Sequence, residues 1–166
     1  MIVVSDTSPV LNLARIGRLE LLPLLYRQVL IPSAVYQDLP PAIDLASLTW
    51  LKVATAKGQN RVQELREDLD PGEAEAIVLA IECRVDLLLV DERRGRRTAT
   101  AAGLTVTGLL GVVARAKQAG LIDLAKPVLD ELIHVARFWI GPELYAEVLE
   151  ELGERGFRSW RRTVNG

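Results

Sequence analysis

Four acidic residues stand where a folded chain could use them together: Asp6, Asp38, Glu73 and Asp91. Asp6 and Asp91 follow the aliphatic runs "IVVS" and "LLLV", which are typical of buried strands. Because the carboxyl ends of parallel strands face one crevice, we expect these two carboxylates to converge. Glu73, in "LDPGEAEAI", heads a helix that would begin at the same crevice. Asp38 lies near the C-terminal end of a short helix, which is an unfavourable place for an anion.

Carboxylates that share a crevice repel one another unless cations neutralise them. The chain has one histidine, His134, and one cysteine, Cys83, so chemistry built on several histidines or thiols is excluded. Both are expected to be ordinary packing or surface residues. Hard oxygen ligands without His or Cys favour Mg²⁺ or Mn²⁺, bound as one ion or as a pair. Such a site commonly serves phosphoryl chemistry.

A run of arginines follows Asp91 in "DERRGRRTA". Guanidinium groups beside a metal site could hold a nucleic-acid backbone, because phosphate contacts position a substrate without reading its sequence. The arginines predicted to bind phosphate are Arg93, Arg94, Arg96 and Arg97.

Each of these features also has a structural interpretation. Asp6 with Thr7 and Ser8 could cap the first helix, and Glu73 could favour a helix N-terminus. The arginine run could be a solvated helix face, Asn12 a surface amide, and Glu75 is expected to be a solvated helix residue. What favours the functional interpretation is the joint arrangement, with carboxylates at two strand exits and arginines beside the second.

The predicted elements fit an α/β fold, since short aliphatic runs alternate with amphipathic, helix-length segments. Strands are expected at 2–5, 29–31, 87–90 and 104–106, with a weaker one at 51–54. Ser8 is expected to cap the first helix, with Pro9 at its first position and Gly17 at its end. Further helices are expected at 17–25, 33–39, 72–83, 92–103 and 108–120.

The C-terminal segment differs in character from the rest. It predicts two helices hinged at Gly141-Pro142, followed by a basic tail that interleaves Phe157 and Trp160 with arginines. We therefore divide the chain into an α/β domain at 1–123 and a helical extension at 124–166.

Length and composition indicate an ordinary folded domain. The chain has 166 residues, of which 49% are hydrophobic, and a formal net charge of −2. The first apolar run is short and broken by Asp6, and no uncharged apolar stretch is long enough to span a membrane, so a cytoplasmic protein is expected. The apolar segments 17–25 and 34–39 predict a homodimer.

Four blocks of this sequence resemble successive blocks of the PIN-domain nucleases, in particular the branch related to VapC-type toxins of toxin-antitoxin pairs. The blocks are "VVSDTSPVLNLARIGRLELL", "VLIPSAVYQDL", "LDPGEAEAIVLAI" and "LLLVDERRGRRTATAAGLTVTGLLGVVARAKQAGLI". They cover about residues 1–123 in the family's order. The resemblance offers little for residues 124–166.

The resemblance implies an α/β/α sandwich with a central, mainly parallel sheet and a Mg²⁺- or Mn²⁺-dependent ribonuclease that leaves a 5′-phosphate and a 3′-hydroxyl. It also implies a cognate antitoxin protein as a partner. The matched acidic positions are Asp6, Asp38, Glu73 and Asp91, of which Asp6, Glu73 and Asp91 are the implied metal ligands. Thr7 or Ser8 matches the accompanying hydroxyl, and Asn12 a supporting residue.

Two positions depart from the usual pattern. Asp38 stands where relatives more often carry Glu, and Glu73 where many carry Asp, with Glu75 as a less favoured alternative to Glu73.

Two other functions remain open. The chain could keep the fold and bind RNA or a protein without cleaving it. The slightly acidic net charge favours this alternative, because nucleic-acid binders are often basic overall. It could also be a phosphatase of the haloacid-dehalogenase type, although that class expects a second Asp where Ser8 stands.

Overall fold

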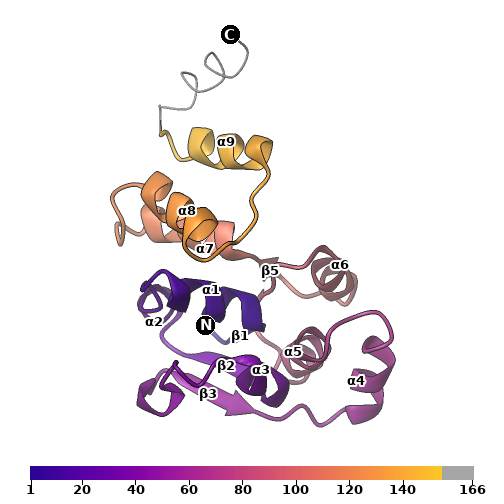
Figure 1. Ribbon diagram of the computed structural model, residues 1–166. Coiled ribbons are helices and arrows are strands. Elements are labelled where there is room, and N and C mark those ends of the chain that lie inside the picture. Colours follow the sequence, from indigo (N-terminus) through magenta and orange to yellow (C-terminus); the bar gives the residue numbers. More distant parts are fainter. Residues whose placement is uncertain (155–166) are drawn as a thin grey trace.

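Five short strands form one parallel sheet in the computed structural model, which describes residues 1–154 (Figure 1). The strand order is β3-β2-β1-β4-β5, and every neighbouring pair is parallel. The strands are β1 (Val3–Ser5), β2 (Val29–Pro32), β3 (Leu51–Ala54), β4 (Leu87–Leu89) and β5 (Val106–Thr107). The expected α/β class with a parallel central sheet is therefore confirmed.

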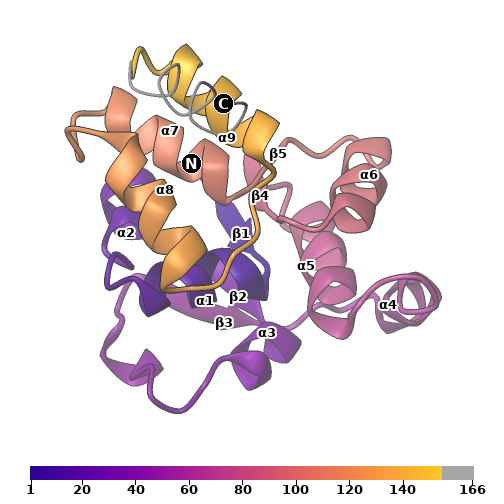
Figure 2. The same cartoon turned by 45° about the horizontal axis from the view of Figure 1, so that its top comes forward.

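Helices cover both faces of this sheet, which confirms the layered arrangement (Figure 2). The helices are α1 (Thr7–Arg15), α2 (Leu21–Tyr26), α3 (Ser33–Asp38), α4 (Gln59–Leu65), α5 (Pro71–Glu82), α6 (Arg93–Ala101), α7 (Leu109–Gln118), α8 (Ala125–His134) and α9 (Pro142–Glu151), with a 3₁₀ turn at Leu45–Ser47. Helices α1, α2, α7 and α8 pack on one face, and α4, α5 and α6 on the other.

The central strands β1 and β4 are aliphatic apart from Ser5, because both of their faces are buried. Successive side chains point to opposite faces of a strand. Val3 and Leu89 accordingly belong to the core beneath α1, α2 and α7, whereas Val4 and Leu88 belong to the core beneath α5. All four side chains are fully buried.

The chain changes direction between β1 and β4, the two strands that carry the candidate carboxylates. From β1 it moves outward to β2 and β3, and then returns to place β4 on the other side of β1. Helix α1 leaves β1 over one face of the sheet, whereas α6 leaves β4 over the other. Ligands bind at such a switch point in open α/β sheets, outside the carboxyl ends of the strands.

Two predicted starts of helices are corrected. Helix α1 begins at Thr7 with Asp6 as its N-terminal flanking residue, so Ser8 is not the cap and Pro9 lies within the first turn. The hydroxyl of Ser8 bonds to a carboxylate instead. Helix α2 begins at Leu21 rather than at Gly17, because Gly17 takes a left-handed conformation (φ 68°) in the preceding turn.

Two further differences concern β5 and α4. The strand expected at 104–106 is observed at Val106–Thr107, because the amide of Leu104 still bonds back to the Ala99 carbonyl at the end of α6, at 3.1 Å. Helix α4 was not expected. It is polar, and Val62 is its only buried residue.

The two expected C-terminal helices, α8 and α9, are present. Pro142 begins α9, with Gly141 before it, but α8 already ends at His134, so the segment 135–141 separates the two helices and they do not meet at Gly141-Pro142. They add Leu129, Leu132 and Leu149 to the core cluster that also contains Val3 of β1. Whether the chain divides at residue 123 stays a prediction. The basic tail, with Phe157 and Trp160, lies outside the described residues. Within residues 1–154, no helix has the length and apolarity needed to cross a bilayer.

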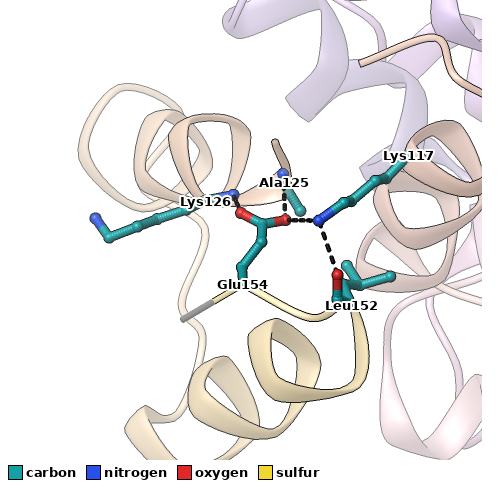
Figure 3. A network of polar contacts seen from close by, with 5 residues as sticks. All are labelled: Lys117, Ala125, Lys126, Leu152 and Glu154. Carbon is teal, nitrogen blue, oxygen red and sulfur yellow. Dashed lines mark hydrogen bonds and ion pairs between the residues drawn. The ribbon is translucent and has the colours of Figure 1, made fainter. Parts of the chain in front are cut away.

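Glu154 fixes the end of the described chain against α8 (Figure 3). Its carboxylate accepts hydrogen bonds from the amides of Ala125 (2.7 Å) and Lys126 (2.9 Å) in the first turn of α8. The Lys117 ammonium lies 2.8 Å from both this carboxylate and the Leu152 carbonyl. Burial raises the pKa of Glu154, but the bonds from Lys117 and the amides outweigh that effect and lower it. This network joins the ends of α7, α8 and α9.

Candidate metal and phosphate site

Asp6 lies at the exit of β1 and is almost completely buried, with 5% of its surface exposed. It occupies the flanking position of α1 in an extended conformation, yet its side chain does not accept the capping hydrogen bond of that helix. The helix-capping interpretation therefore does not account for this carboxylate.

The surroundings of Asp6 disfavour its charge. Burial is the largest cause that raises its pKa to about 7, and the charges of the three other candidate carboxylates add to the rise. The nearby Thr7 amide opposes the rise. The three neighbouring charges are those of Glu73, Asp91 and Asp38. Asp6 is thus the group on which the charges of the three other predicted carboxylates act together.

Asp91 follows β4 and is held by two hydrogen bonds. Its Oδ1 accepts from the Leu109 amide at the start of α7, at 2.7 Å, and its Oδ2 accepts from the Ser8 hydroxyl, at 2.8 Å. Burial raises the pKa of Asp91, and these two bonds oppose the rise. The Arg96 charge opposes it as well.

Ser8 is itself oriented by Asn12, one turn later in α1. The Asn12 amide donates to the Ser8 carbonyl at 2.9 Å and to the Ser8 hydroxyl at 3.0 Å. Asn12 is 6% exposed, so it is not a surface amide. The structure therefore places Ser8 and Asn12 behind Asp91, where they fix its carboxylate.

Glu73 lies in the first turn of α5 and is 5% exposed. Its Oε2 accepts from the Asp70 amide at 3.3 Å, as part of a capping box that starts the helix. Its Oε1 is buried without a hydrogen-bond partner. Burial is the main cause that raises the pKa of Glu73, and the Asp70 amide opposes the rise. The helix-start interpretation thus explains one oxygen of Glu73 and leaves the other unexplained.

Asp38 differs from the other three carboxylates because it is exposed, at the last position of α3. Its Oδ2 accepts from the Thr7 hydroxyl at 3.2 Å. Asp38 and Thr7 therefore form the solvent-facing rim beside Asp6.

Glu75, the other acidic residue at the start of α5, has a structural position. It was expected to be a solvated helix residue, but it is half-buried and accepts from the Ala34 amide at 2.9 Å. This bond supplies a partner to an otherwise unpaired amide in the first turn of α3. The contact joins α5 to α3, and no local pattern in the sequence indicates it.

The arginines of α6 are all exposed, but they do not all lie next to the carboxylates. Gly95 and Ala99 form the buried side of α6. Arg96 lies beside Asp91, whose pKa its charge lowers. No ion pair within residues 1–154 involves Arg93, Arg94, Arg96 or Arg97. Arg96 is therefore the arginine that the structure brings to the site.

The donor chemistry of the site fits a hard divalent cation, although a complete ligand set is not assembled. Within residues 1–154, no three His, Cys, Asp or Glu side chains are grouped so that they could hold a metal ion. The buried Oε1 of Glu73 nevertheless lacks any partner, and Asp6 is buried without a capping role. Neither the histidine nor the cysteine belongs to this group of carboxylates: His134, at the end of α8, is exposed, and Cys83, at the end of α5, is half-buried.

Comparison with protein families adds one finding to this geometry. The model of the family DUF3368, described as a PIN domain, matches residues 2–154. No curated protein and no solved structure matches the chain. The family match does not address the VapC-type branch, which stays a prediction. Because the match spans nearly the whole chain and the parallel sheet agrees with it, the chain belongs to the PIN-domain family, a nuclease-type family.

Proposed function

We propose that this protein is an endoribonuclease that depends on Mg²⁺ or Mn²⁺. The observation that carries the proposal is the buried Asp6 carboxylate, which caps no helix and is surrounded by the charges of Glu73, Asp91 and Asp38. Without a cation, such a cluster opposes folding, since burial and like charges both disfavour ionised carboxylates. A bound divalent ion would reverse that effect.

The chain offers Asp6, Glu73 and Asp91 as metal ligands. Asp91 would present a carboxylate already oriented by Ser8 and the Leu109 amide, and Glu73 would present the oxygen that has no other partner. Asp38, at the rim, would assist from the solvent side. When bound, the metal supplies an activated water and neutralises charge on a phosphodiester.

The exposed arginines support a polyanionic substrate. Arg96, whose charge acts on Asp91, would hold a phosphate next to it, and the other three would hold flanking phosphates along α6. Recognition through phosphates and the shape of the crevice, and not through base contacts, favours single-stranded or looped RNA.

The test is cleavage of end-labelled RNA by purified protein in Mn²⁺ and in EDTA. We expect cleavage only with the metal, and a steep loss in Asp6→Asn. Glu64→Gln is a matched control, because Glu64 is exposed on α4 and belongs to no part of the site. Equal cleavage by wild type and Asp6→Asn would contradict the proposal.

A second function is binding of RNA or protein without cleavage. One observation favours it, namely that no complete metal-ligand group is assembled in residues 1–154. RNA binding that persists in EDTA, together with no cleavage in either Mg²⁺ or Mn²⁺, would select this alternative.

We also propose a cytoplasmic homodimer that acts as a toxin with a cognate antitoxin. The dimer was predicted from the apolar segments around α2 and α3. Most of those side chains belong to the core, including Leu21, Leu22 and Val35. Leu24 and Tyr36 remain exposed, at 61% and 47%, and they support the dimer.

A further inference from the structure

Each of the three proposed metal ligands has a glycine directly against one carboxylate oxygen. The distances follow from placing a Cβ atom on each glycine. That atom would lie 3.1 Å from Oδ1 of Asp6 at Gly72, 2.8 Å from Oε1 of Glu73 at Gly95, and 2.5 Å from Oδ1 of Asp91 at Gly108. Real Cβ atoms essentially never come within 3.0 Å of another heavy atom, which applies to the positions at Gly95 and Gly108, whereas the contact at Gly72 is tight but not forbidden.

Backbone conformation does not explain these glycines. The glycines with positive φ are Gly17, Gly103, Gly120 and Gly153, within the described chain, so Gly72, Gly95 and Gly108 have φ values open to any residue. Gly95 even lies inside α6, where alanine is a better helix former. The space that a side chain would occupy is the remaining explanation.

We infer that Gly72, Gly95 and Gly108 are positioning residues, each of which keeps free the volume that one carboxylate needs in order to bind the cation. The inference rests on the proposed function. It concerns the placement of the ligands and not the fold, because the atom that a methyl group would meet first is the end of a flexible carboxylate.

Gly95 gives the sharpest case. The oxygen that its methyl group would displace is Oε1 of Glu73, the buried atom with no hydrogen-bond partner. Val90 is also close to this position, with its Cγ2 at 3.1 Å, so the backbone has little room to shift and carry the methyl group away. Gly95→Ala should therefore move the Glu73 carboxylate.

Gly108 controls two groups. The same Cβ position that approaches Asp91 lies 3.0 Å from Nη1 of Arg96. A methyl group there would disturb both the carboxylate that Leu109 holds and the arginine that is proposed to bind phosphate.

Gly58 offers a matched control. A Cβ atom there would lie 3.2 Å from Oε1 of Glu82, so it too faces a carboxylate. Glu82 is at the opposite end of α5 from Glu73, and it accepts hydrogen bonds from the amides of Lys57 and Gly58 before α4. Gly58→Ala therefore tests the general effect of a methyl group against a structural carboxylate.

The experiment measures Mn²⁺ affinity of the full chain by calorimetry, and thermal unfolding in EDTA and in Mn²⁺. We expect Gly95→Ala and Gly108→Ala to bind Mn²⁺ about 10- to 100-fold more weakly, as when groups that orient metal ligands are lost. Gly72→Ala, whose contact is the longest of the three, should lose less. Gly58→Ala should bind as wild type does.

A second-site rescue separates positioning from damage to the fold. Glu73→Asp shortens the side chain by one methylene and withdraws the oxygen from Gly95. In that background, Gly95→Ala should change Mn²⁺ affinity far less than it does in wild type, which is the coupling expected of residues in contact. The same non-additivity should appear in the melting temperatures in EDTA.

The outcomes separate the inference from the proposed function. Wild-type protein that does not bind Mn²⁺ would overturn both. Wild-type protein that binds Mn²⁺, with glycine variants that bind it equally, would overturn the glycine inference alone. Strictly additive effects of Gly95→Ala and Glu73→Asp would overturn it as well. If Gly108→Ala does not fold, the Mn²⁺ affinity of Gly72→Ala, whose contact is the mildest of the three, still tests the inference.

Discussion

Replacing Asp6 by Asn should stabilise the metal-free protein, and the gain should grow with pH. Burial and neighbouring charges raise the pKa of Asp6 to about 7 in the folded state, compared with 3.8 for an ordinary aspartate. Between these pH values the folded protein holds a proton that the unfolded chain has released. The wild type therefore loses stability as the pH rises from 3.8 to 7, whereas the variant is spared this loss.

The size of the effect follows from the shift. One pKa unit corresponds to about 1.36 kcal/mol, so a rise of about three units disfavours folding by about 4 kcal/mol once the pH exceeds 7. Burying an amide in place of the carboxylate has its own penalty, but that penalty does not depend on pH. The difference in free energy of unfolding between variant and wild type should therefore increase by about 3 kcal/mol from pH 4.5 to pH 8.

The assay is urea unfolding in EDTA at several pH values, with the free energy extrapolated to water. Asp68→Asn is the control, because Asp68 is exposed before α5. Its curve should stay parallel to that of the wild type. Parallel curves for Asp6→Asn and wild type would refute the claim that Asp6 is buried among like charges. Saturating Mn²⁺ should stabilise the wild type and have little effect on Asp6→Asn.

Three further predictions concern the arginines, the C-terminal network and the oligomeric state. Arg96→Ala and Arg97→Ala should each reduce the salt dependence of RNA binding by about one counterion, whereas only Arg96→Ala should also slow cleavage at saturating RNA; identical cleavage by the two variants would remove Arg96 from the site. Glu154→Gln should lower the free energy of unfolding by about 2 kcal/mol, because it removes a charged acceptor from Lys117 and two amides, and an unchanged urea midpoint would contradict this. Light scattering should give twice the chain mass of 18.3 kDa at micromolar concentration; a particle of the chain mass would rule out the dimer.

The sequence predicts the sheet well because its strands are buried on both faces. Continuous aliphatic runs contain Val3, Val4, Leu88 and Leu89, all of which are buried. Such short runs are typical of strands in a parallel sheet that is covered on both faces. Helix α4 escaped prediction because Val62 is its only buried residue, which gives no amphipathic pattern. Tertiary context, and not local periodicity, defines that helix.

The site was predictable to the extent that the ends of parallel strands converge. Asp6 and Asp91 are neighbours because β1 and β4 pair, and the strand exits indicated this. The role of Ser8 was not visible, since the hydroxyl that looks like a helix cap bonds to Asp91 from a distant part of the chain. Glu75 was misjudged for the same reason, as its partner is the Ala34 amide.

The glycines show a signal that sequence reasoning passed over. Gly95 interrupts the polar helix "ERRGRRTATA" at a position where nothing in the helix itself requires glycine. A glycine in the middle of a helix is unfavourable relative to alanine, and therefore indicates close approach by another group. Which group approaches is a question of tertiary structure.

The most direct test of the central claim is anomalous scattering from a crystal soaked in Mn²⁺. We predict a peak of anomalous density among the carboxylates of Asp6, Glu73 and Asp91, with Oε1 of Glu73 as one ligand. A wild-type crystal that shows no peak among these carboxylates at saturating Mn²⁺ would contradict the account.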